Sequence, residues 1–145
     1  MAENTTTAAP VSIGSLLTPT KTLTMSYPDI EGWEVELTYL SREELMKVRN
    51  RCLKQKFNKK TRAFEEVLDE DLFLTNYVNA VIKGWSGLKY KHLSELVLVD
   101  LGDTDPQADC EYSQENAEIL MKNSPNFDTW VTECVGELEN FTSDK

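Results

Sequence analysis

Alternating apolar and polar positions near the start of the chain predict a β-hairpin. Residues 21–27 (KTLTMSY) alternate and are rich in threonine, which is typical of a strand. Residues 28–32 (PDIEG) form a turn, because proline fixes φ and glycine tolerates a positive φ. Trp33, Val35 and Leu37 share one face of the next strand. A lone hairpin is marginal in water, so helices must cover its apolar face.

Helical periodicity follows the hairpin. The segment from Ser41 to Glu44 (SREE) has the pattern of a capping box and predicts a helix that runs to about Lys56. Residues 57–67 hold an Asn-Lys-Lys turn between aromatic residues, which favours a second short hairpin. From Asp69 onward, apolar residues recur with a helical period, and glycines end the predicted helix. These apolar residues are Leu74, Tyr77, Val78, Val81, Ile82 and Trp85, and the glycines are Gly84 and Gly87.

The last third of the chain predicts two helices joined by almost no loop. Ser113 caps a helix that runs to about Asn123. Ser124 then provides the N-cap of the next helix and Pro125 its first residue. The apolar stripe of this last helix consists of Phe127, Trp130, Val131, Cys134, Val135, Leu138 and Phe141. Residues 88–99, between the two helical regions, form a loop that leads into either a short helix or a short strand. An acidic loop follows over residues 100–109.

The pattern as a whole predicts a mostly helical α+β fold, in which the N-terminal β-hairpin packs on about four amphipathic helices. Residues 1–20 bury too little apolar surface to offset their ordering entropy and are expected to form a flexible tail. Residues 21–141 are expected to form a single globular domain, followed by a C-terminal tail over residues 142–145. The apolar stretches are far shorter than the roughly 20 residues of a membrane span. The N-terminus has no pattern of a secretory signal, so a cytoplasmic location is expected.

Charge is divided unevenly along the chain. Residues 42–62 carry nine basic and two acidic side chains, a net charge of +7, whereas the whole protein carries −10 and the remainder therefore −17. An acidic protein repels nucleic acid and membrane surfaces, while a basic stretch can steer an acidic partner or serve only as a solvated face. Only Phe57 and Phe64 interleave the basic residues, which does not favour a nucleic-acid groove. The candidate electrostatic patch consists of Arg42, Arg49, Lys56, Lys59 and Lys60.

The residue types needed for catalysis or metal binding do not occur in a recognisable pattern. His92 is the single histidine, and catalysis by a Cys–His pair would require Cys110 to meet it. The three cysteines have no CxxC spacing, so they are interpreted as small apolar residues. The acidic loop lacks the glycine and the final glutamate of an EF-hand. We therefore expect a non-enzymatic protein without a cofactor or a metal site.

Aromatic residues offer either a core or a docking surface. Trp85 is either a core anchor or an exposed interface residue. The stripe of the last helix also fits a core, although a domain of this size can leave a groove open between its helices. A groove lined by tryptophan, methionine and leucine is how amphipathic partner helices are received.

Three segments follow one another along the chain, namely residues 40–45 (LSREEL), 81–88 (VIKGWSGL) and 112–127 (YSQENAEILMKNSPNF). Together they resemble the tail assembly chaperones of tailed bacteriophages, over nearly the whole of residues 21–141. The segment ending in Gly-Trp-Ser-Gly is the most specific part of this resemblance, and the proline-started helix with phenylalanine and tryptophan is the second.

The resemblance implies a viral assembly factor that acts in the host cytoplasm and is usually absent from the finished particle. Its client would be the long, helical tape measure protein, which such a chaperone coats and keeps from aggregating while tail tube subunits polymerise around it. The predicted partners are thus the tape measure protein, the tail tube protein and further copies of the chain, without nucleic acid or membrane. The candidate client-binding residues are Trp85, Phe127 and Trp130, with Met121 supplying adaptable packing.

Two other classes of function stay open. A structural subunit of the virion, such as a tail tube or connector subunit, would form rings and remain in the particle. An acidic inhibitor would mimic nucleic acid and occupy the basic cleft of a host protein, with an affinity that falls as salt rises.

Overall fold

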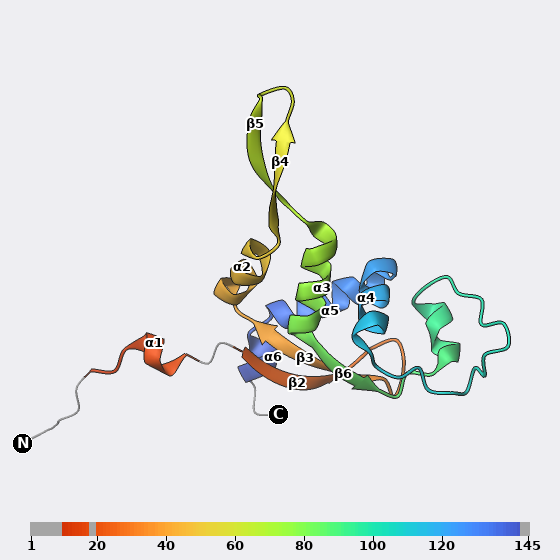
Figure 1. Cartoon of the computed structure of the whole chain (residues 1–145). Coiled ribbons are helices and arrows are strands. Elements are labelled where there is room, and N and C mark those ends of the chain that lie inside the picture. Colours follow the sequence, from red (N-terminus) through yellow and green to blue (C-terminus); the bar gives the residue numbers. More distant parts are fainter. Residues whose placement is uncertain (1–9, 18–19, 143–145) are drawn as a thin grey trace, which may run out of the picture.

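The computed structural model describes residues 10–17 and 20–142 of the chain. The proposed N-terminal and C-terminal tails therefore fall largely outside the described residues, apart from the short helix α1 (Ile13–Leu16), whose apolar side chains are exposed. The fold is α+β, as the sequence predicts (Figure 1). The other elements are β2 (Thr20–Ser26), β3 (Glu34–Leu40), α2 (Arg42–Asn50), β4 (Leu53–Asn58), β5 (Ala63–Leu68), α3 (Glu70–Val81), β6 (Ile82–Ser86), a 3-10 helix (Tyr90–Glu95), α4 (Gln114–Asn123), α5 (Pro125–Gly136) and α6 (Glu139–Thr142).

A three-stranded antiparallel sheet forms the base of the molecule, in the order β2-β3-β6. The predicted hairpin is confirmed, with Met25 opposite Val35 and Leu23 opposite Leu37. The third strand corrects the prediction of one helix through Trp85, because α3 ends at Val81 and the chain continues as β6. The open edge of β3 offers backbone hydrogen bonds that a longer helix could not use, so sheet pairing overrides the helical period.

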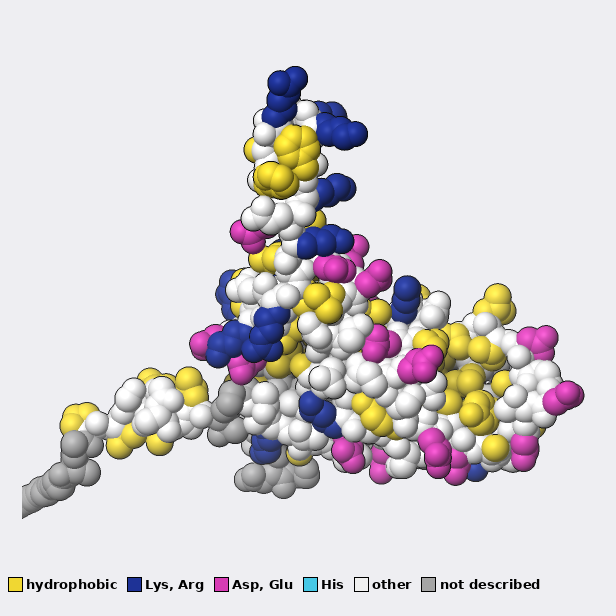
Figure 2. Space-filling model, viewed as in Figure 1, with side chains coloured by type: hydrophobic (Ala, Val, Ile, Leu, Met, Phe, Trp, Pro, Cys, Tyr) yellow, Lys and Arg dark blue, Asp and Glu magenta, His cyan; other side chains and the backbone are white. Residues whose placement is uncertain are grey.

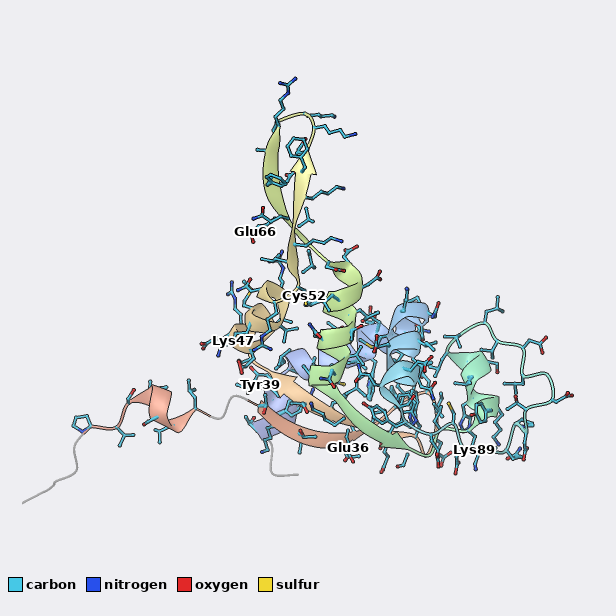
Figure 3. All side chains as sticks on the ribbon, in the orientation of Figure 1. Glu36, Tyr39, Lys47, Cys52, Glu66 and Lys89 are labelled. Carbon is cyan, nitrogen blue, oxygen red and sulfur yellow. The ribbon has the colours of Figure 1, made fainter. Side chains whose placement is uncertain are left out.

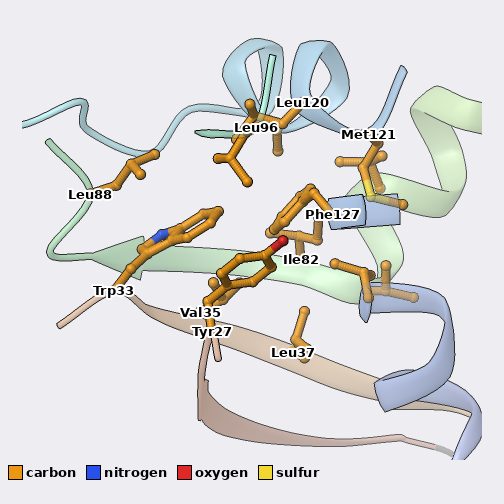
Figure 4. Packing of buried hydrophobic residues seen from close by; sticks show 14 of the residues in the cluster. Tyr27, Trp33, Val35, Leu37, Ile82, Leu88, Leu96, Leu120, Met121 and Phe127 are labelled. Carbon is orange, nitrogen blue, oxygen red and sulfur yellow. The ribbon is translucent and has the colours of Figure 1, made fainter. Parts of the chain in front are cut away.

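Helices cover one face of the sheet and enclose the core. The buried side chains come from the sheet, from the inner faces of α3, α4 and α5, and from the loop regions around the 3-10 helix (Figure 4). Trp33 lies at the centre and is fully buried, with the ring of Phe127 stacked 5.2 Å away and that of Trp85 edge-on at 5.8 Å. The predicted inward face of the second strand is thereby confirmed.

A second hairpin, made of β4 and β5, projects away from this body (Figure 1). The prediction of a short hairpin with an Asn-Lys-Lys turn is confirmed. The prediction that the preceding helix runs to Lys56 is wrong, since α2 ends at Asn50. Residues 53–58 (LKQKFN) alternate as a strand does, and pairing with residues 63–68 satisfies their backbone groups.

The helical hairpin at the C-terminus has the predicted caps. Ser113 Oγ accepts a hydrogen bond from Asn116 N at 3.0 Å, and Ser124 Oγ accepts one from Phe127 N at 3.2 Å. The last apolar stripe is broken, however, because α5 ends at Gly136 and Leu138 is exposed. Within residues 10–17 and 20–142, no helix has both the length and the apolar character that crossing a bilayer requires.

Candidate protein-binding surfaces

The arm, which we define as residues 53–68, is a largely exposed hairpin. Both of its strands carry mostly exposed side chains. Phe57 and Phe64 face each other across the strands with ring centroids 5.4 Å apart, and they are 49% and 68% exposed. Because an aromatic pair in a monomer is normally covered, this pair makes the arm a candidate contact surface.

The two faces of the arm differ in chemistry. Because side chains alternate along a strand, Phe57 and Phe64 share a face with the Gln55–Glu66 pair, whereas Lys54 and Lys56 point to the other face. Basic residues also occupy the turn, where Asn58 Oδ1 accepts hydrogen bonds from Lys60 N at 2.8 Å and Thr61 N at 3.4 Å. Figure 2 shows basic side chains along one edge and at the tip of the arm, beside an apolar patch.

The foot of the arm is held against the body. Cys52 lies where α2 meets β4 (Figure 3), and its carbonyl accepts a hydrogen bond from Asp69 N at 2.7 Å, directly before α3. Cys52 Sγ donates to the Val48 carbonyl at 3.2 Å and accepts from Asn76 Nδ2 at 3.3 Å. These bonds join the arm to both neighbouring helices and set its direction.

An apolar hollow of about 380 Å³ opens beside the arm's foot, between α2, α3, α4 and α5. Leu45, Phe73, Tyr77 and Met121 line it. Burial raises the pKa of Tyr77 above its usual 10.0, although a hydrogen bond with Thr132 acts in the opposite direction. The phenol is therefore neutral at physiological pH, and the hollow presents an uncharged surface with a hydroxyl at its edge.

An acidic groove of about 490 Å³ runs between α3 and α4 on the other side of Leu74, a residue that lines both hollows. Leu74 and Ile119 give this groove an apolar floor, while Asp71 and Glu115 add exposed carboxylates. Glu118 also lines it.

Two polar side chains hold the carboxylate of Glu118 in place by hydrogen bonds. Glu118 accepts hydrogen bonds from Thr75 Oγ1 at 2.7 Å and from Gln114 Nε2 at 3.0 Å. Lys122 is the basic residue of the groove, and its Nζ lies 3.9 Å from Asp71 Oδ1. Both side chains of that pair are largely exposed, so the pair adds little stability. The groove keeps a negative character.

The predicted client-binding residues Trp85, Phe127 and Trp130 are brought together, but in and around the core. Phe127 is fully buried, and Trp85 and Trp130 are half-buried. Trp85 Nε1 donates to the Cys110 carbonyl at 2.9 Å, which ties it into the body. Met121 is 4% exposed and lines the apolar hollow. Of the four, Met121 is therefore the one that the structure places at a hollow between helices.

The predicted electrostatic patch is split between two elements. Arg42 and Arg49 lie exposed on α2, whereas Lys56, Lys59 and Lys60 lie on the arm. All five are exposed, and they are divided between a helix, a strand and the turn that follows it.

Among the described residues, the structure shows no catalytic arrangement of cysteine and histidine side chains. Burial raises the pKa of Cys110 above its usual 9.0, so this cysteine stays a thiol at neutral pH. His92 Nδ1 accepts a hydrogen bond from Lys89 N at 3.1 Å and thereby closes the 3-10 helix. In the part of the chain that the structure describes, no group of three or more histidine, cysteine or acidic side chains could hold a metal ion.

The sequence pattern did not predict that Phe57, Phe64, Phe73 or Tyr77 would lie at a candidate binding surface. The signal for the first two was present, because they flank a basic turn in an alternating segment. Phe73 and Tyr77 stack with ring centroids 5.7 Å apart. Tyr77 belongs to the apolar helical stripe and is indistinguishable from its core residues, whereas Phe73 lies next to that stripe.

A family model described as "YdaY prophage protein" matches residues 38–145. The chain belongs to this family. The family match begins within β3 and contains the arm, the apolar hollow and the acidic groove. It confirms the phage origin that the sequence suggested. No curated protein and no solved structure matches the chain.

Proposed function

We propose that this prophage protein is a non-catalytic tail assembly chaperone that binds and solubilises the tape measure protein in the host cytoplasm. The observation that carries the proposal is the apolar hollow, whose lining comes from four helices and is mostly hydrophobic. An amphipathic client helix would place a large apolar side chain there, in the manner of a helix received by a groove. Met121 is suited to such a site, because its flexible thioether adapts to different partners.

Charge supports the same role. A net charge of −10 keeps many copies soluble and mutually repelling when they gather on one client. Glu70 and Asp128 lie at the hollow and would pair with basic residues flanking an apolar client stripe. Modest affinity at each copy then adds up along a long rod through multivalency.

The experiment is co-expression with the tape measure protein of the same prophage, measuring the soluble fraction of that client. Phe73→Ser and Leu45→Ser each remove an apolar contact from the hollow, and we expect each to lower client solubility several-fold. Leu98→Ser is the matched control, since Leu98 is fully exposed and distant in sequence from the hollow. Thermal melting of each variant shows that the fold survives.

Affinity capture with mass spectrometry of finished particles completes the test. Recovery of the tape measure protein, together with absence of this chain from particles, supports the chaperone. Unchanged client solubility in both hollow variants, with intact folds, would sink the proposal.

The arm favours a second candidate, namely a structural tail tube or connector subunit. An exposed hairpin that adds nothing to the core of its own subunit is suited to contacting a neighbouring one. Presence of the chain in finished particles would select this function.

A further inference from the structure

We propose that the protein associates head to tail with a second copy of itself, the arm of one copy lying in the acidic groove of the next. The arm holds five basic and two acidic side chains, whereas the body carries a strong excess of acidic ones. The two surfaces thus have opposite charge within one chain. This inference is independent of the client that the protein binds.

Chemical complementarity extends beyond charge. Phe57 and Phe64 expose an aromatic pair that lacks a cover, and the groove offers an apolar floor from Leu74 and Ile119. Lys59 and Lys60, in the turn next to Phe57, would meet the carboxylates of the groove. Glu115 is exposed and available for such pairing. Oppositely charged rims around an apolar centre are the usual anatomy of a specific interface.

Geometry excludes the same contact within one molecule. Asp71, on the groove, follows the last residue of β5 by three positions, so the groove lies near the arm's foot. Six residues of strand carry the tip about 20 Å away from that foot. The hydrogen bond between Asp69 N and the Cys52 carbonyl closes the foot of the arm, from which the hairpin projects away from the body (Figure 1). The tip therefore reaches the groove of a neighbour and not its own.

Edge-to-edge strand pairing is a less favourable way to cover the arm. Lys54 and Lys56 stand on β4, and exposed lysines are a known means of blocking the addition of further strands. Arm-to-groove contact uses the side chains of the aromatic face and of the turn, so Lys54 and Lys56, which point to the other face, do not oppose it. Since the two surfaces differ, the contact is heterologous and generates a ring or an open chain of subunits.

Sedimentation velocity of the purified full chain over a range of concentrations tests the proposal without any client. We expect the wild type to form larger species as concentration rises. Lys60→Glu on the arm and Glu115→Lys in the groove should each weaken association at least about tenfold, because each turns an attraction into a repulsion. Lys91→Glu and Glu111→Lys are matched controls with the same charge changes at exposed positions outside both surfaces, and they should associate as the wild type does.

Mixing the two reversed variants provides the decisive readout. The glutamate at position 60 of one variant can pair with the lysine at position 115 of the other, so an equimolar mixture should regain association that neither shows alone. A wild type that stays monomeric at millimolar concentration overturns the proposal. So do reversed variants that associate as strongly as the wild type while melting at the same temperature.

Discussion

At the scale of single residues, two glycines far apart in the sequence meet where the sheet turns. Gly87 follows β6 with φ of 85°, and Gly32 lies in the β2–β3 turn with φ of 89°. A Cβ at Gly87 would clash with the carbonyl oxygen of Gly32, whereas a Cβ at Gly32 itself would meet open space. At Gly87 a side chain is excluded by both the steric clash and the positive φ. At Gly32 a side chain is disfavoured by the positive φ alone.

Gly87→Ala should therefore destabilise the fold by about 3 kcal/mol, combining backbone strain with overpacking. Gly32→Ala should cost about 1–2 kcal/mol, the strain of a left-handed conformation. Urea unfolding followed by circular dichroism measures both values. Equal losses in the two variants would contradict the close approach of the backbones.

The sequence predicted part of this arrangement. The sequence predicts Gly87 near the end of a helix, whereas in the structure it follows a strand and has a positive φ. Its contact with Gly32 could not be foreseen, because it depends on the pairing of β6 with β3, which brings together two glycines that are 55 positions apart. The burial of Phe127 illustrates the same limit, since a helical stripe does not reveal whether it faces the core or a partner.

At the scale of elements, local signals identified the helix starts well and the helix ends poorly. Ser41, Ser113 and Ser124 all cap helices as predicted, because capping depends on neighbours three residues away. The ends of α2 and α3 were misplaced because the chain leaves each helix to pair with a distant or newly formed strand. The arm's hairpin could be predicted, but its projection from the body and its exposed aromatic pair could not.

Among the three caps, Ser124 should contribute most to stability. It is fully buried, and Ser124→Ala leaves the amide of Phe127 without its partner in an apolar site. We expect a loss of about 2 kcal/mol, against about 0.5 kcal/mol for the more exposed Ser41→Ala. Comparing the urea midpoints of the two variants checks the order, and a larger loss at Ser41 would contradict it.

At the scale of the whole molecule, burial makes the fold sensitive to alkali. It raises the pKa of Tyr27, Tyr77 and Tyr112 above 10.0, and that of Cys110 and Cys134 above 9.0. Since the folded state then holds these protons more tightly than the unfolded state, the contribution of these groups to stability is fully present below about pH 8. It falls as pH rises through the range in which the unfolded thiols and then the phenols ionise.

The free energy of unfolding should therefore be unaffected by the ionisation of these groups between about pH 7 and 8, and it should decline at higher pH, first with the thiols and then with the phenols. Tyr77→Phe removes one of the phenols and should make the decline above pH 10 shallower than in the wild type. Urea unfolding at closely spaced pH values measures both slopes. A variant that loses stability as steeply as the wild type would show that Tyr77 does not contribute.

The construction of the arm also has a consequence for how such phage proteins diversify. Its two strands and turn are one uninterrupted run of residues, and both ends meet at the Cys52–Asp69 hydrogen bond. A single short stretch of gene therefore encodes the whole projection, while the core is encoded on either side of it. Recombination between prophages can exchange that stretch in one event, which would change the projecting surface while the residues of the core cluster are inherited unchanged.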